Sequence, residues 1–202
     1  MNKKYHVILF LLSLLVFVSY FGSKLFAEKN YLEGQLLVAS PGMSDLRFAE
    51  TVILICQHNS TGALGLVLNR PAGQIKISKL LESLDITSSG INGDIQVRLG
   101  GPLATDTGFL MYSDEYESEK NLCNKSGVTV SSNKEVLKRL KTVKYNNNLV
   151  LFFGYAGWGP NQLETELANE DWITVSADTS ILFDQDIKSL WKKARARHAI
   201  DL

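Results

Sequence analysis

Gly34-Gln35-Leu36-Leu37-Val38-Ala39-Ser40-Pro41-Gly42-Met43 joins an apolar run to a turn rich in proline and glycine. Similar clusters return further on, at Gly100-Gly101-Pro102 and at residues 154–160, each beside another apolar run. Glycine and proline in such clusters fix turns that few other residues can form. The chain therefore specifies its backbone path strongly, whereas residues with recognisable chemistry are few.

Hydrophobic patterning predicts an α+β domain. Short helices are expected at residues 78–84, 132–140, 161–169, 178–183 and 186–199. Strands are expected at residues 34–39, 51–58, 63–69, 95–99, 108–112, 128–130, 149–153 and 172–175. Pro71 is expected to end the third strand, because proline cannot donate to a ladder. The strands cluster early without helices between them, which disfavours a doubly wound parallel sheet and predicts one mixed sheet.

A hydrophobic leader, residues 1–27, precedes the domain at residues 28–202. From residue 7 to residue 21 every side chain is apolar or aromatic except two serines. The flanking lysines are separated by 19 residues, about 28 Å as a helix, against a hydrocarbon core of about 30 Å. The run suits an uncleaved anchor or a signal peptide, although Leu25 makes cleavage after Ala27 unfavourable. A misread start codon is the third alternative.

The flanking charges and the composition set expectations for location and partners. Two lysines ahead of the leader favour a cytoplasmic N-terminus, so a translated and retained leader would place the domain outside the cytoplasm. Without the leader, the domain holds 18 basic and 21 acidic groups, a net charge of about −3. Such a domain offers no field for a polyanion. We therefore expect no specific nucleic acid, and membrane contact only through residues 7–21.

Cys56 and His58 are the weak catalytic candidates. They lie two apart on a predicted strand, so both side chains would leave the same face. A thiol beside an imidazole is a nucleophile–base pair, but about 7 Å along a strand is long for a direct hydrogen bond. A packed cysteine and a hydrogen-bonded histidine are the alternative. No second Cys/His pair completes a zinc site, so no metal is predicted.

Cys56 and Cys123 are the two cysteines of the chain. They permit one disulfide if the domain is exported. A buried Cys56 with Cys123 in a loop is the alternative, since free cysteine is among the most buried residue types.

The glycine-rich segments supply a candidate ligand or partner surface. Residues 154–160 precede a predicted helix, where a phosphate cradle can form. A capping box of Asn161 with Glu164 would satisfy the same donors internally and favours a structural turn. Gly100-Gly101-Pro102 would let a ligand approach the backbone, or serve a bulge or a tight crossing. The candidate surface consists of Asn69, Arg70, Gly100, Gly101, Pro102, Trp158, Gln162 and Glu164.

These blocks resemble the AlgH/YqgE family of bacterial proteins, from about Gly34 to Leu202. The resemblance implies a single α+β domain with a bent, mostly antiparallel, partly barrel-like sheet and flanking short helices. It implies no established activity and no cofactor. Asn161 departs from the glycine usual there, and typical members lack a leader and look cytosolic. The matching motifs are Gly34-Gln35-Leu36, Pro41-Gly42-Met43, Asp45-Leu46-Arg47-Phe48, Cys56-Gln57-His58-Asn59, Gly62-Ala63-Leu64-Gly65, Asn69-Arg70-Pro71, Gly100-Gly101-Pro102, and residues 154–160 with Gln162-Leu163-Glu164.

Three functions from different classes follow. A non-enzymatic binding module for an unidentified protein or small ligand fits the turns and the composition best. A transcriptional regulator would have to act indirectly, because the sequence has no helix-turn-helix pattern and no basic stripe. A thiol-dependent enzyme would depend on Cys56 and His58 alone.

Overall fold

The computed structural model describes residues 31–87, 93–113, 121–133, 136 and 148–198. The chain divides into two compact units, residues 1–31 and Leu32–Leu202. The predicted leader lies outside the described residues and stays a prediction. The helices within the described ranges are all too short or too polar to cross a membrane.

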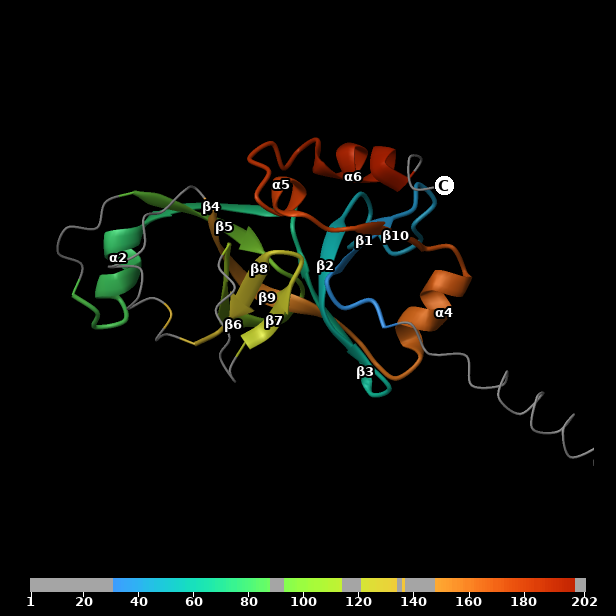
Figure 1. The fold of residues 1–202 in the computed structure, drawn as a ribbon, viewed down its shortest axis with the longest axis horizontal. Helices are drawn as coiled ribbons and strands as arrows, with labels where there is room; N and C mark the ends of the chain where they lie inside the picture. Colours follow the sequence, from blue (N-terminus) through green and yellow to red (C-terminus); the bar gives the residue numbers. More distant parts are fainter. Residues whose placement is uncertain (1–30, 88–92, 114–120, 134–135, 137–147, 199–202) are drawn as a thin grey trace, which may run out of the picture. The chain divides into compact units, whose positions relative to one another are not determined.

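The described residues of the domain form a ten-stranded sheet (Figure 1). One parallel pair, β5 with β9, joins otherwise antiparallel neighbours, so the described sheet is mixed and mostly antiparallel as predicted. β4 (Pro71–Lys76) pairs with β5 (Asp94–Leu99) off the main path. The main path runs β10 (Trp172–Ser176), β1 (Gln35–Ala39), β2 (Val52–Asn59), β3 (Gly62–Val67), β9 (Leu149–Trp158), β6 (Leu103–Tyr112), β8 (Val128–Ser131) and β7 (Asn121–Lys125).

The sheet bends around a core without closing. β9 is long enough to pair with β5 at residues 150–153, with β6 between residues 149 and 155, and with β3 at residues 156–158. Leu36 of β1, Leu54 of β2 and Val130 of β8 belong to one buried cluster, although these strands lie toward opposite ends of the path. The described path still ends at β7 and β10, so the sheet is open, and the predicted bent, partly barrel-like sheet is confirmed.

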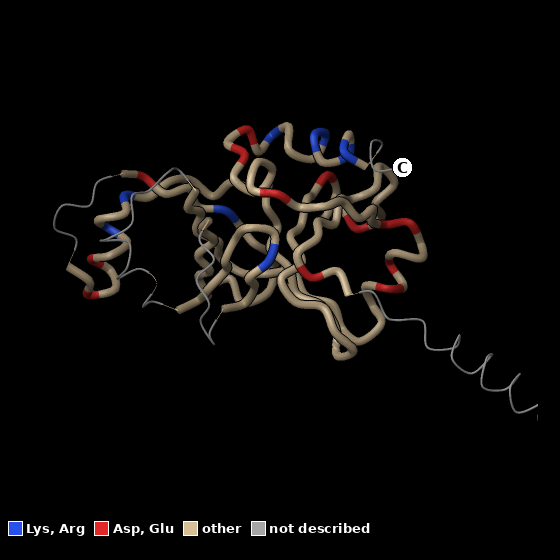
Figure 2. Tube along the Cα trace, viewed as in Figure 1, with Lys and Arg blue, Asp and Glu red and all other residues tan. Residues whose placement is uncertain are grey.

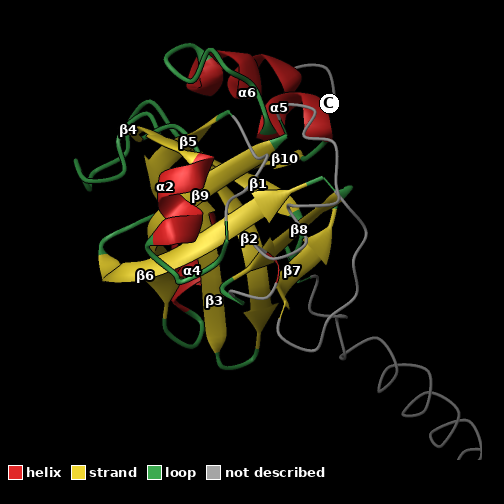
Figure 3. Cartoon of the chain, turned by 90° about the vertical axis from the view of Figure 1, so that its left-hand side faces the viewer, coloured by secondary structure: helices red, strands yellow, loops and turns green. Residues whose placement is uncertain are grey.

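Short helices cover the sheet on different sides (Figure 3). α6 (Leu190–His198) and α5 (Thr179–Leu182) bury Leu190 and Ile181 against the cluster that contains Leu36. α4 (Gln162–Ala168) buries Leu163 against the side chains of Leu37 and Ile53, which alternate with Leu36 and Leu54. α2 (Ile77–Glu82) packs on a third cluster. Because strand side chains alternate, α4 and α6 cover opposite faces of β1 and β2.

A fully buried arginine ties the C-terminal part of the chain to the sheet. Arg98 of β5 donates to the Leu68 carbonyl oxygen at 2.9 Å and to the Asp184 carbonyl oxygen at 3.2 Å. Burial lowers the pKa of Arg98 to about 10, so the guanidinium is charged at neutral pH. Its hydrogen bonds join the end of α5 to the strand edge.

The structure differs from the predicted elements at Pro71, at β7 and at the C-terminal helix. Pro71 begins β4, where its missing donor costs little at the first position of a strand. β7 was not predicted at all, because its sequence is mostly polar. The C-terminal helix begins at Leu190, since residues 187–189 form a turn. The helix predicted at 132–140 falls largely outside the described residues.

Candidate functional site

A β-bulge separates the two catalytic candidates. The register of β2 with β3 shifts between Ile55 and Gln57, so the strict alternation of side chains breaks there. Cys56 belongs to the cluster beneath α5 and α6. His58 stands opposite Ala63, which belongs to the cluster beneath α4. The prediction that Cys56 and His58 leave the same face was therefore wrong.

The His58 imidazole joins the segment just before β1 to α4. Its Nδ1 accepts a hydrogen bond from the Leu32 backbone N–H at 3.1 Å. An accepting Nδ1 leaves the proton of the neutral ring on Nε2, and Nε2 lies 3.4 Å from Oε1 of Glu164. Because both ring nitrogens face these groups and the side chain is 2% exposed, His58 is held in a fixed orientation.

The Cys56 thiol lies in the core beside Cys123. Both cysteines are free and buried, and both belong to the same cluster. Burial raises the pKa of Cys56 well above its ordinary value, whereas an activated cysteine has a lowered pKa. Cys123 lies on β7 and is not in a loop, contrary to the alternative that placed it there. The thiol of Cys56 is therefore shielded and protonated at neutral pH.

Gly100 and Gly101 allow two backbone segments to touch. A Cβ atom on Gly101 would stand 2.1 Å from the carbonyl carbon of Tyr155, and one on Gly100 would stand 2.2 Å from the Gly154 oxygen. These contacts identify a tight crossing, which was one of the alternatives for this motif. β9 runs through Gly154 to Trp158 as a strand. The turn predicted at these residues is therefore wrong.

Asn69 and Arg70 brace the loop between β1 and β2. The Asn69 side chain accepts from the Val52 N–H at 3.0 Å and donates to the Glu50 carbonyl oxygen at 2.8 Å. Arg70 donates to the Ala49 carbonyl oxygen at 2.9 Å. These bonds fix the backbone directly behind Phe48, so the two candidates support the loop.

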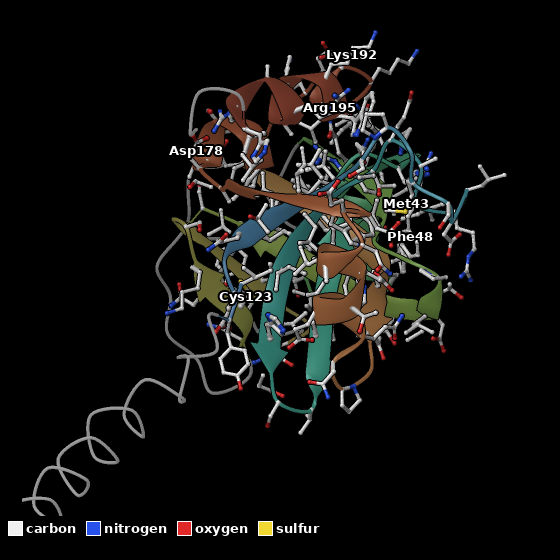
Figure 4. All side chains as sticks on the ribbon, turned by 90° about the vertical axis from the view of Figure 1, so that its right-hand side faces the viewer. Met43, Phe48, Cys123, Asp178, Lys192 and Arg195 are labelled. Carbon is white, nitrogen blue, oxygen red and sulfur yellow. The ribbon has the colours of Figure 1, made fainter. Side chains whose placement is uncertain are left out.

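That loop forms one wall of a hollow with a volume of about 380 Å³, which we name the tryptophan cleft. β6 and the end of β9 form further walls, and α4 with the start of β10 completes it. Met43 and Phe48 lie close together in Figure 4, on the side of the molecule that α4 covers. The cleft is lined by Met43, Ser44, Asp45, Arg47, Phe48, Pro102, Leu103, Gly157, Trp158, Gln162, Glu166, Asp171 and Trp172.

Glu166 organises the floor of the tryptophan cleft. Its Oε2 accepts the indole N–H of Trp158 at 2.7 Å and that of Trp172 at 2.8 Å. Its Oε1 accepts from Nε2 of Gln162 at 2.9 Å. The two indole rings meet edge to face at 6.2 Å, and Phe48 meets Trp172 in the same way at 5.9 Å. One carboxylate and three aromatic rings thus form a preorganised surface.

Arg47 and Asp45 form an ion pair on the loop wall. The Arg47 guanidinium donates from Nη2 at 2.7 Å and from Nε at 3.0 Å to the two carboxylate oxygens of Asp45. The hydrogen bonds from Arg47 hold the pKa of Asp45 below its ordinary value. The same guanidinium lies 5.9 Å from the centroid of the Phe48 ring. The single arginine of the cleft is therefore already paired.

Of the predicted surface, Pro102, Trp158 and Gln162 line the tryptophan cleft, and Glu164 faces His58 instead. Phe48, Glu166 and Trp172 were not among the predicted site residues. Phe48 lies in one of the family motifs, but no local pattern indicates that four distant stretches meet. The capping box was also wrong: Asn161 has φ 60° and its side chain makes no capping bond, while Gln162 Oε1 accepts from Gly159 N–H at 3.0 Å.

A second hollow of about 520 Å³ lies between α2 and β6. Its lining is mainly apolar and hydroxylic, with Asp106 as the charged member. Within the described ranges, no three His, Cys, Asp or Glu side chains stand close enough to hold a metal ion.

The bent open sheet with its flanking helices defines a class of α+β domain, and comparison with known proteins identifies which one. Residues 36–202 match the family described as AlgH-like. The chain belongs to this family. A UPF0301 protein of Afipia carboxidovorans is 38% identical over 181 residues, covering 86% of each chain. A UPF0301 protein of Methylococcus capsulatus is 38% identical over 82% of this chain and 90% of its own.

Solved structures agree with the fold. The solution structure of AlgH from Pseudomonas aeruginosa superposes with a TM-score of 0.68 at 33% identity, covering 85% of this chain and 91% of that one. A crystal structure of a Corynebacterium diphtheriae protein gives a TM-score of 0.64 at 22% identity, covering 82% and 86%. The second likeness concerns the fold alone.

Proposed function

We propose that the domain is a non-enzymatic binding module that holds a segment of a partner protein in the tryptophan cleft. The observation that carries this proposal is the convergence of four distant stretches on one aromatic hollow. Its volume lies at the lower end of the range for ligand pockets, which suits one or two side chains. Phe48 is half-buried on the loop wall, and Trp158 and Trp172, which are 7% and 4% exposed, support it from the floor. Aromatic groups at a binding surface provide contact at small entropic cost.

The rigidity of the cleft supports the same function. Glu166, Asn69 and Arg70 fix its floor and its loop wall by hydrogen bonds to neighbouring groups. A preorganised surface loses little entropy when a partner binds. Leu103, which is 44% exposed on the wall, gives an incoming side chain an apolar contact.

The two alternatives have less support. A thiol-dependent enzyme needs the Cys56 thiol near a base, and the bulge in β2 puts His58 on the other face. An indirectly acting regulator remains compatible with a binding module, because a protein that holds a partner can change transcription without touching DNA.

Site-specific photocrosslinking tests the proposal. A photoreactive amino acid is placed at Leu103 in the full-length chain, and at Leu99 as the control. Leu99 is 51% exposed and lies outside the cleft lining. In cells of the source bacterium, we expect a discrete protein adduct at position 103 and none at position 99. Equal labelling at both positions, or no adduct at position 103, would contradict the proposal.

A further inference from the structure

The chemistry of the tryptophan cleft indicates what occupies it. Building on the proposed function, we infer that the partner segment presents an arginine side chain to the cleft. Four observations carry this inference: unpaired carboxylates in the lining, an internal cation that is already neutralised, an apolar wall, and an acidic surrounding surface.

Two of the lining carboxylates have no cationic partner. The Glu166 carboxylate accepts hydrogen bonds from three neutral groups. Asp171 takes part in hydrogen bonding through its backbone, because its carbonyl oxygen accepts from the Ser40 N–H. Among the described residues, no lysine or arginine forms an ion pair with Glu166 or Asp171. A half-buried carboxylate without a counter-ion attracts one, because the surrounding protein screens charge less than water does.

Arg47, the cation that lines the cleft, is not the counter-ion of Glu166 or Asp171. Its guanidinium is held by Asp45 through both carboxylate oxygens. The pair is neutral as a unit, so the lining carries the uncompensated charge of Glu166 and Asp171. An incoming cation therefore has no competitor inside the cleft.

The apolar part of the lining matches the stem of arginine. Phe48, Trp158 and Trp172 stand beside the carboxylates rather than apart from them. Arginine carries a methylene stem that packs on apolar surface and a planar guanidinium that stacks on aromatic rings. The guanidinium also binds carboxylates with two parallel hydrogen bonds. Arg47 over the Phe48 ring is an example of such stacking within this chain.

The surface around the cleft would attract a basic segment. From residue 149 to residue 187 the chain contains no lysine or arginine. Glu164, Glu166 and Asp171 lie on α4 and the turn that follows it, which Figure 2 draws without a blue segment. A surface of one sign steers a partner of the opposite sign and raises its association rate.

A substitution at Asp171 tests the charge of the cleft without disturbing the fold. Glu166 anchors two indoles, so its substitution would disturb the fold as well as the charge. The Asp171 side chain has no hydrogen bond to lose, so Asp171→Asn removes charge alone. Glu170→Gln is the matched control, because it removes the same charge from the neighbouring residue, which does not line the cleft.

The probe is a fluorescein-labelled heptapeptide with a central arginine flanked by leucines, and its twin carries neutral citrulline. With the full-length chain in detergent, we expect the arginine peptide to bind about tenfold more tightly than the citrulline peptide. Asp171→Asn should remove most of this difference, and Glu170→Gln should leave it. The indole N–H signals of Trp158 and Trp172 should shift, while that of Trp191, which donates to the Ala39 carbonyl oxygen, stays.

The outcomes distinguish this inference from the proposed function. Equal affinity for the arginine and citrulline peptides would overturn the arginine inference and leave the binding module standing. Binding of neither peptide, or binding that leaves the Trp158 and Trp172 signals unchanged, would also overturn it. A lysine peptide that binds as tightly as the arginine peptide would overturn the choice of arginine. The proposed function fails separately, on the missing Leu103 adduct.

Discussion

Gly101 has no room for a side chain, because the backbone of β9 passes directly beside it. A Cβ at this position would stand 2.2 Å from the Tyr155 carbonyl oxygen, closer than any relaxed contact. We expect Gly101→Ala to lower the free energy of unfolding by about 3 kcal/mol, measured by urea denaturation. Gly42→Ala is the control, since a Cβ there meets nothing within 4 Å and should change stability by less than about 0.5 kcal/mol. Equal unfolding midpoints for the two variants would show that the crossing relaxes freely.

Arg98 contributes to stability through both its charge and its stem. Arg98→Ala would remove the donors for the Leu68 and Asp184 carbonyl oxygens and leave a cavity, so we expect a loss of about 3 kcal/mol. Arg98→Met keeps an apolar stem and should recover part of that loss. Thermal and urea unfolding of both variants would separate the contribution of the charged hydrogen bonds from that of the apolar stem. If methionine proved no better than alanine, the stem would contribute nothing.

Residues of the cleft show why sequence analysis found only part of the site. Trp158 and Gln162 lie in a glycine-rich motif and could be selected from it. Trp172 lies in an ordinary strand pattern, and only the register Ala39↔Trp172 brings it to the loop that carries Phe48. Likewise, the bulge that separates Cys56 from His58 has no sequence signal of its own, because Ile55 and Gln57 suit a regular strand equally well. Long-range pairing decides these cases, and one sequence does not specify it locally.

At the scale of elements, α5 and α6 are joined through Asp178. Its Oδ1 caps α5 by accepting from the Ile181 N–H at 3.0 Å, and its carboxylate pairs with Arg197 of α6. The hydrogen bond from Arg197 is the main reason why the pKa of Asp178 lies well below its ordinary value of 3.8. A carboxyl whose pKa is lowered in the folded state stabilises the fold at and above its unfolded pKa. That contribution is lost as the pH falls below about 4.

Asp178→Asn tests this contact, because asparagine also caps helices but carries no charge. At pH 7 we expect the variant to be less stable than the wild type. The difference between their urea midpoints should shrink as the pH falls from 5 to 3, because the carboxyl of the unfolded wild type then takes up a proton while the folded one stays ionised. A difference that stays constant over this range would show that the ion pair is not the source.

Elements with regular apolar patterns were predicted well, and the exceptions share a physical cause. β2 and the first half of β9 are buried and rich in β-branched or aromatic residues, so composition alone indicates them. β4 exposes Gln74 and Lys76 and has one partner strand, so it carries no hydrophobic alternation. Its backbone pairing with β5 stabilises it, and backbone pairing leaves little trace in side-chain pattern.

At the scale of the whole molecule, we expect the chain to bind duplex DNA weakly. The basic residues of α6 are largely used within the chain: Lys193 pairs with Asp184 and Asp186, and Arg195 lies over the Trp191 ring. Figure 4 shows Lys192 and Arg195 on α6, and neither residue lines the cleft. Few cations are free to displace counterions from DNA. Fluorescence anisotropy at physiological salt should detect no sequence preference, and nanomolar affinity for one sequence would contradict this.

The position of β9 in the sheet has a consequence for co-translational folding. β9 hydrogen-bonds to β3, β5 and β6, all of which precede it in the chain. These strands cannot form their final sheet until residue 158 of 202 has been synthesised. Until then, the edges of β3 and β6 that β9 will cover are open to other chains. Synthesis that stalls before β9 would therefore release fragments prone to aggregation, and the nascent domain would depend on chaperones until its ninth strand emerges.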